Sequence, residues 1–204
     1  MTIPRIVVLS LLSALACCMS SAQAEQVGRK PAAFIVEPAS TWRFLPKRDL
    51  LPIGWQTNLS AVEFSGIGIS PIGYGYPNLG TEIYAGERHD KIPAVYVATE
   101  FDVSIAQFAQ QQNITLFLRC DDGCIAYING FEVARLRIPD QDITTFAAES
   151  ISHADGFLPF SIPVRKLRDG ENTLAIEVHQ RSPSSSDLIV DAALSPVNPL
   201  LVPK

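Results

Sequence analysis

The stretch NTLAIEVH, residues 172–179, alternates apolar and polar side chains along its whole length. Leu174, Ile176 and Val178 would share one face of an extended chain. His179 would lie on the opposite face. An alternation with a period of two predicts a β-strand with one face in a hydrophobic core.

The same pattern recurs on both sides of this stretch. Residues 113–119 and 188–194 alternate in the same way, and Gly, Pro, Asn or Asp interrupts the chain about every 8–12 residues, a spacing typical of an all-β sandwich. Further strands are expected at 33–37, 42–45, 94–103, 124–129, 131–137 and 157–162. Residues 104–111 are rich in Ala and Gln and predict one or two helical turns. The glycine-rich segment 64–93 predicts a long loop, either functional or ordered by packing.

The N-terminus has the features of a secretory signal peptide. Arg5 precedes an apolar stretch, residues 6–19, and an Ala-Gln-Ala cleavage signal ends at Ala24. We therefore expect cleavage after Ala24 and a secreted or periplasmic protein. Lipidation of Cys18 is the alternative, although the residue before a lipidated cysteine is usually smaller than Cys17.

Cleavage would leave 180 of the 204 residues, enough for one domain with a proper core. We expect a lead-in at 25–40, a β-sandwich at 41–194 and an extended tail at 195–204, which contains three prolines. Loss of Arg5 takes the formal net charge from −5 to −6. There is no basic run, which argues against a nucleic-acid partner. No later apolar stretch is long enough to span a bilayer, so the protein is not expected to be transmembrane.

Two of the four cysteines, Cys120 and Cys124, remain after the predicted cleavage. In an oxidising compartment they allow one intramolecular pairing, so we expect a disulfide, with free or metal-bound thiols as the alternative. A thioredoxin-type redox role requires two intervening residues at a helix N-terminus. Here three residues intervene between predicted strands, which argues against that role.

Asp121-Asp122-Gly123 separates the predicted strand at 113–119 from the next one at 124–129. Asp side chains bond nearby backbone N–H groups and Gly supplies a positive φ, so these residues predict a tight turn. Adjacent carboxylates are also ligands that Ca²⁺ accepts, although no EF-hand spacing is present. A Ca²⁺ site at Asp121 and Asp122 is therefore an alternative to a purely structural turn.

Asn129-Gly130 lies between two β-rich stretches and predicts a tight hairpin, because both residues tolerate the positive φ of a type I′ turn. Arg135 follows on the second strand of this hairpin, where a polar side chain is available for a ligand.

The segment from His179 to Asp187 contains a histidine, a glutamine, several serines and an aspartate, which raises the question of a catalytic triad. A nucleophilic serine requires a base within hydrogen-bond reach and a rigid turn. No Gly-x-Ser-x-Gly motif is present, and the serines follow Pro183. A polar histidine at the end of a strand, a ligand-binding role and catalysis are the three alternatives.

The aromatic residues fall into two groups. Tyr74 and Tyr76 flank Gly75, so their rings could be exposed for stacking on sugars or could cover the end of the sandwich. Trp42 and Trp55 are expected to pack in the core.

Taken together, these pieces resemble the galactose-binding-like jelly-roll modules of secreted bacterial multidomain proteins. In chain order they are Trp42-Arg43-Phe44, Trp55, Pro71 to Gly75, Val95-Tyr96, Phe101, Asp121-Asp122-Gly123, Tyr127 to Gly130, Val133 to Arg135, Leu167 to Gly170, Asn172 to Ala175, Val178 to Gln180 and Ser185 to Asp187. The resemblance covers roughly residues 40–194 and implies an all-β jelly-roll sandwich of about eight strands with a carbohydrate-binding-module-like fold. The cysteines flanking the Asp-Asp-Gly turn depart from the pattern of the family.

The leading hypothesis is a secreted, non-catalytic protein that binds carbohydrate, a glycoconjugate or another cell-envelope component. A structural or protein-interaction module of the envelope is the alternative, and a hydrolase using His179 with Asp187 or with the Asp121/Asp122 pair is the third. The candidate ligand site is a cluster at one end of the sandwich, which we call the corner cluster: Asp121, Asp122, Arg135, His179, Gln180, Ser186, Asp187, Tyr74 and Tyr76. Apart from possible Ca²⁺, no cofactor is expected.

Overall fold

The computed structural model of the protein describes residues 34–140, 146, 148 and 156–196. The chain divides into two units, residues 1–31 and 32–204, and every described residue belongs to the second. The predicted signal peptide, most of the lead-in and the tail beyond residue 196 lie outside the described residues. Within the described part of the chain, no helix has the length and apolarity needed to cross a membrane.

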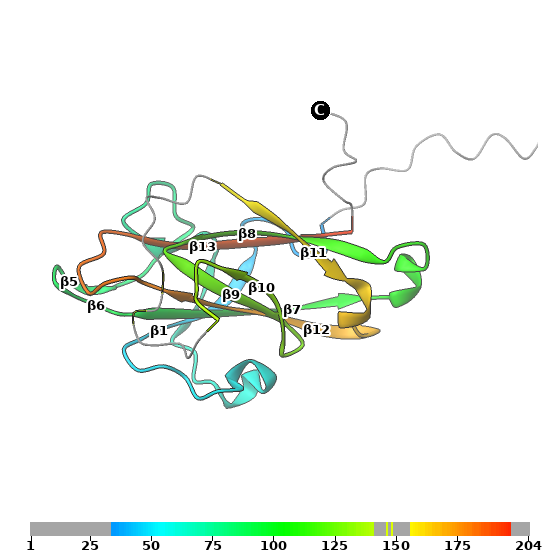
Figure 1. The fold of residues 1–204 in the computed structure, drawn as a ribbon, viewed down its shortest axis with the longest axis horizontal. Coiled ribbons are helices and arrows are strands. Elements are labelled where there is room, and N and C mark those ends of the chain that lie inside the picture. The colour runs from blue at the N-terminus through cyan, green and yellow to red at the C-terminus, as the bar shows by residue number, and fades with distance from the viewer. Residues whose placement is uncertain (1–33, 141–145, 147, 149–155, 197–204) are drawn as a thin grey trace, which may run out of the picture. The chain divides into compact units, whose positions relative to one another are not determined.

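Two main sheets pack face to face, which confirms the all-β sandwich (Figure 1). One sheet has six strands in the order β10-β9-β12-β7-β1-β2, and the other has five in the order β11-β8-β13-β3-β4. The strands are β1 (Thr41–Lys47), β2 (Gly66–Ile69), β3 (Ile72–Tyr74), β4 (Thr81–Glu82), β5 (Gly86–Glu87), β6 (Asp90–Lys91), β7 (Ala94–Val103), β8 (Asn113–Asp121), β9 (Gly123–Ile128), β10 (Phe131–Leu136), β11 (Leu158–Pro163), β12 (Gly170–His179) and β13 (Leu188–Ser195).

The long strands lie where the sequence pattern predicted them. The observed and predicted structures differ in short elements. The two main sheets hold eleven strands rather than about eight, because the glycine-rich segment 64–93 contributes β2, β3 and β4. One of its glycines, Gly73, is required by close packing, since a Cβ there would clash with the Leu188 carbonyl of the neighbouring strand.

Helix is confined to four short 3-10 segments among the described residues: η1 (Trp55–Thr57), η2 (Leu59–Ala61), η3 (Ile105–Phe108) and η4 (Val164–Lys166). The helical turns predicted at 104–111 are present only as η3. Phe108 is buried in the core and anchors this segment.

The main core lies between the two sheets. Leu174, Ile176 and Val178 of β12 are fully buried in it, as their alternation predicts. Leu116 and Leu118 of β8 meet them from the other sheet. Trp42 is buried in the same core, which confirms the expectation for this residue.

The chain passes from one sheet to the other at Asp121-Asp122-Gly123. Asp121 pairs with Ile189 in the five-stranded sheet, whereas Gly123 pairs with His179 in the six-stranded sheet. The chain bends at Asp122, where a tight turn was predicted, but the bend does not close a hairpin, because β8 and β9 belong to different sheets. Gly123 is not among the glycines with positive φ. It is needed for space, since a Cβ there would lie 2.8 Å from the Arg137 carbonyl oxygen.

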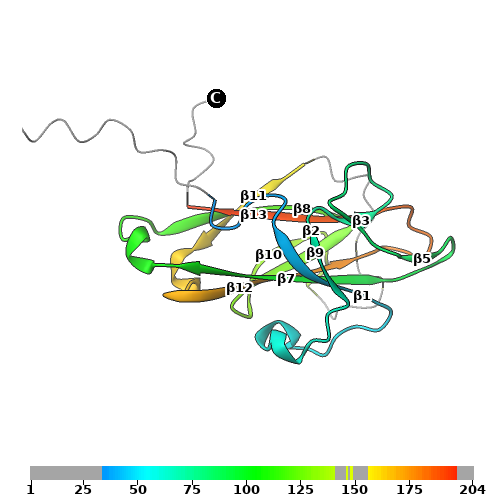
Figure 2. The ribbon, with the colours of Figure 1, turned by 180° about the vertical axis from the view of Figure 1, so that it is seen from behind.

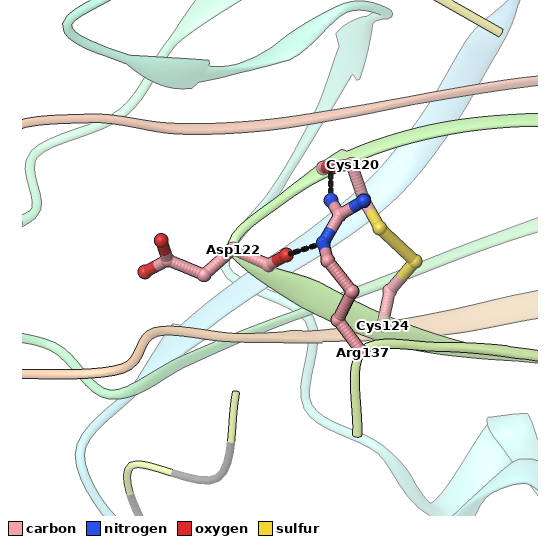
Figure 3. The surroundings of a disulfide bond; sticks show 4 residues. All are labelled: Cys120, Asp122, Cys124 and Arg137. Carbon is pink, nitrogen blue, oxygen red and sulfur yellow. Dashed lines mark hydrogen bonds between the residues drawn. A yellow bond between two sulfur atoms is a disulfide. The ribbon is translucent and has the colours of Figure 1, made fainter. Parts of the chain in front are cut away.

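The predicted disulfide joins Cys120 to Cys124 across this crossing (Figure 3). Both cysteines are buried in the main core. The Arg137 guanidinium donates to the carbonyl oxygens of Asp122 and Cys120. The disulfide and the Arg137 hydrogen bonds together stabilise the connection between the two sheets.

The Asn129-Gly130 hairpin is confirmed. Asn129 has φ of 52° and Gly130 has φ of 82°, and Ile128 pairs with Phe131 directly across the turn. The register shifts further along, between Glu132 and Ala134.

Candidate functional site

Most residues of the corner cluster lie close together, but they are buried. Five of them are at most 7% exposed: Tyr74, Asp121, Asp122, His179 and Gln180. Tyr76 and Asp187 are half-buried, and Ser186 is exposed. The expectation that Tyr74 offers an exposed ring for stacking is therefore wrong.

The buried polar groups of the corner cluster are bonded largely to one another. Asp122 Oδ2 accepts hydrogen bonds from the Arg181 amide at 2.9 Å and from Ser185 Oγ at 3.3 Å. The Tyr74 hydroxyl lies 2.8 Å from Gln180 Oε1 and 3.0 Å from the Ser185 carbonyl oxygen. Burial raises the pKa of Tyr74. This arrangement satisfies buried polar groups, as a stable fold requires.

Within the corner cluster, the carboxylate of Asp121 is only partly hydrogen-bonded. The Tyr76 hydroxyl donates to its Oδ2 at 2.8 Å, while its buried Oδ1 has no hydrogen-bond partner among the described residues. Burial, together with the nearby charges of Asp122 and Asp187, raises the pKa of Asp121 to about 6, against the opposing effect of the Tyr76 hydrogen bond. In the described residues, no group of three or more His, Cys, Asp or Glu side chains is arranged to hold a metal ion.

His179 and Arg135 lie apart from this network. His179 is on the face of β12 that points away from the main core, where its Nε2 lies 3.6 Å from Glu177 Oε2. Neither ring nitrogen of His179 has a hydrogen-bond partner within the described structure. Its carboxylate neighbour is therefore Glu177, rather than Asp187 or the Asp121/Asp122 pair that the hydrolase hypothesis named.

A second hydrophobic cluster covers this outer face of the six-stranded sheet. Its sheet members alternate with those of the main core: Ala94, Tyr96, Ala98, Ile125, Tyr127 and Ala175. The cover is the connection between β1 and β2, which contributes Trp55 and Leu59. Figures 1 and 2 both show this connection, with η1 and η2, on the side of the sheet away from β8 and β13.

A cavity of about 500 Å³, which we call the Trp55 pocket, opens in this outer layer. Its lining residues are Leu50, Leu51, Pro52, Ile53, Gly54, Trp55, Gln56, Tyr96, Tyr127, Arg135, Asp140 and Glu177. The volume lies within the usual range of small-molecule sites, about 300–1,000 Å³. It combines three aromatic rings with a few polar groups, as such sites commonly do.

The polar centre of the pocket is Glu177, which is 5% exposed. Trp55 Nε1 donates to its Oε2 at 3.3 Å and the Tyr127 hydroxyl donates to its Oε1 at 2.6 Å. Burial is the main cause that raises the pKa of Tyr127, and the Glu177 charge adds to it. The Tyr96 hydroxyl accepts the Leu51 amide at 3.0 Å, and burial raises the pKa of Tyr96 to about 12.

The predicted residue Arg135 lines this pocket, whereas Trp55, Tyr96, Tyr127 and Glu177 were not predicted as site residues. The sequence contained no signal for Glu177, because an acidic residue on the polar face of an alternating strand is expected to face solvent, and only the structure shows it buried. Its partners could not be deduced, because Trp55 lies 122 positions away in the chain.

No protein-family model matches the chain, and no curated protein matches it. Among solved structures, it is similar to the β-glucuronidase of Ruminococcus gnavus, with 15% identity and a TM-score of 0.46 over 74% of this chain and 23% of that chain. It is also similar to a β-glucuronidase of an uncultured Clostridium sp., with 18% identity and a TM-score of 0.48 over 82% of this chain and 30% of that chain. The chain thus spans less than a third of either enzyme, and at these scores the likeness carries no argument about function.

Proposed function

We propose that the protein is a secreted, non-catalytic binding protein that holds a carbohydrate or glycoconjugate in the Trp55 pocket. The observation that carries this proposal is the pocket itself, which places three aromatic rings around a buried carboxylate. Aromatic rings pack against the apolar faces of sugar rings, and fixed polar groups bind their hydroxyls. A galactose-binding-like fold, as the sequence resemblance implies, is compatible with this role.

Burial of the candidate catalytic groups supports a non-catalytic role. A general acid or base must come within hydrogen-bond reach of the substrate. His179, Asp121 and Asp122 are each at most 2% exposed. Hydrolysis using His179 would require these groups to rearrange. Activity towards glycoside substrates that disappears in a His179→Ala variant would contradict the proposal.

Export is part of the proposal, and the Cys120–Cys124 disulfide supports it, because disulfides persist mainly in oxidising compartments. Intact mass spectrometry of the exported protein should give a chain that begins at Glu25. A mass that includes a diacylated Cys18 would instead establish a lipoprotein.

The two tryptophans of the chain allow a direct binding test. In Trp42→Phe, Trp55 is the only remaining indole, so its emission reports on the pocket. Titration with soluble glycan fragments should change this emission, and calorimetry should give the same dissociation constant. The Trp55→Phe variant is the matched control, in which the fluorescence change should vanish and the calorimetric affinity should fall. The absence of both signals for every glycan tested would overturn carbohydrate binding.

A second candidate function is a protein-interaction module of the cell envelope. The observation that favours it is the edge strand β2, where the side chains of Ile67 and Ile69 are 72% and 51% exposed. Unpaired edge strands can accept another chain. A partner that co-purifies with the protein, resists competition by sugars and is lost in an Ile67→Lys variant would support this function. An unchanged partner profile in that variant would exclude β2 as the contact.

A further inference from the structure

The charged groups around the Trp55 pocket are predominantly negative. Arg135 is already paired with Glu132 through two bonds, Nε to Oε1 at 2.8 Å and Nη2 to Oε2 at 2.6 Å. Asp140 Oδ1 lies 3.8 Å from the same guanidinium. The lining therefore holds two carboxylates, Asp140 and Glu177, and one permanent positive charge, Arg135, which Glu132 already pairs, so the pocket favours a ligand that brings positive charge.

Glu177 is the buried carboxylate of this set and retains acceptor capacity. A carboxylate has about four lone-pair positions, and Trp55 and Tyr127 occupy two of them. In the part of the chain that the structure describes, no lysine or arginine lies within 4 Å of the Glu177 carboxylate. Besides Tyr127, the titratable group near Glu177 is His179, at 3.6 Å, which forms no hydrogen bond through either ring nitrogen within the described structure. A buried carboxylate with free acceptor positions is suited to an ammonium group.

The aromatic rings add a second attraction for a cation. Trp55 packs at 80° to Tyr96, with ring centroids 5.0 Å apart, and at 80° to Tyr127, with centroids 6.2 Å apart. The wall of the pocket is therefore built from rings in two orientations around one carboxylate. Ring faces attract ammonium groups, most strongly where water is excluded.

From these three observations we infer that the ligand carries a protonated primary amine, as in a glycan with free, non-acetylated amino sugars. This inference rests on the proposed carbohydrate-binding function and specifies its ligand class. Glu177 accepts hydrogen bonds from the ammonium group, and the rings of the pocket pack against the sugar. The neutral N-acetylated form of the same sugar lacks the charge that Glu177 pairs with.

The test compares two disaccharides that differ only in this group, the disaccharide of glucosamine and its N-acetylated counterpart. At about pH 6 the free amine is protonated. Calorimetry with the full mature chain should give an affinity about tenfold higher for the free amine. The preference should disappear in Glu177→Gln. Glu171→Gln is the matched control, because Glu171 is an exposed glutamate on the same strand and lies outside the pocket.

The outcomes separate this inference from the proposal on which it rests. Equal or stronger binding of the acetylated disaccharide overturns the amine preference and leaves carbohydrate binding intact. If neither disaccharide binds and no other glycan binds either, both the amine preference and carbohydrate binding are overturned. The comparison of the two ligands uses the unmodified protein, so it remains decisive if Glu177→Gln fails to fold.

Discussion

At the scale of single residues, two buried acidic side chains, Asp122 and Glu177, lie in different surroundings. Asp122 accepts hydrogen bonds from the β12–β13 connection and closes a buried network. Glu177 is also buried, but it lies in the wall of a cavity open to solvent. The first residue stabilises a connection in the fold, whereas the second contributes a carboxylate to the wall of the Trp55 pocket.

Asp121 makes stability depend on pH in a direction that can be predicted. Its pKa is raised from 3.8 in the unfolded chain to about 6 in the folded protein, mainly by burial. The folded state therefore binds this proton more tightly, and the corresponding stability is fully present below about pH 4 and lost as the pH rises through 6.

In an Asp121→Asn variant the side chain at position 121 cannot ionise, so this part of the stability should not be lost as the pH rises. Its free energy of unfolding relative to the wild type should rise by about 1–3 kcal/mol between pH 4 and pH 7, measured by urea denaturation. Asp102→Asn controls for the removal of one exposed negative charge. A difference between Asp121→Asn and wild type that does not change with pH would contradict the raised pKa.

At the scale of elements, the hairpin between β9 and β10 supports the cover of the Trp55 pocket. Gly130 in its turn has φ of 82°, and a Cβ at this position would lie 2.8 Å from Thr57 Cγ2 of η1. The turn and the 3-10 helix that carries Trp55 are therefore in direct contact.

A Gly130→Ala variant should be destabilised by both effects. We expect a loss of about 2 kcal/mol in the free energy of unfolding, together with an altered Trp55 emission in the Trp42→Phe background. Gly170→Ala is the control, because Gly170 has φ of 84° and no atom within 4 Å of the added Cβ. It should show the backbone strain alone, about 1 kcal/mol, and leave the emission unchanged. Equal behaviour of the two variants would mean that the hairpin does not position η1.

At the scale of the whole sandwich, the Cys120–Cys124 disulfide connects the two sheets rather than closing a hairpin. The ring it closes contains five residues, for which loop-closure entropy predicts about 2 kcal/mol of stabilisation. The double variant Cys120→Ala/Cys124→Ala should lose about this amount in urea denaturation.

Chemical reduction of the wild type should produce a similar loss, and it should have no effect on the double variant. Because both cysteines are buried in the main core, on the other side of the six-stranded sheet from Trp55, ligand affinity should change little. A large loss of affinity would show that the crossing and the pocket are coupled.

The sequence by itself determined the fold class and the long strands. Alternation along NTLAIEVH, and the Asn-Gly hairpin after β9, depend on local stereochemistry, which neighbouring residues reveal. The sequence also indicated that the residues around Asp121 and Gln180 lie near one another. It could not show that these residues are buried, because burial depends on segments that are distant in the chain and pack against them.

Only the tertiary structure revealed the Trp55 pocket. Whether the outer face of a strand meets water or a second layer is set by segments distant in the chain, here the connection between β1 and β2. Trp55 and Glu177 are 122 positions apart, yet they share a hydrogen bond in the pocket wall. Local patterns specify the two faces of a strand, and long-range packing determines which face is covered and carries the pocket.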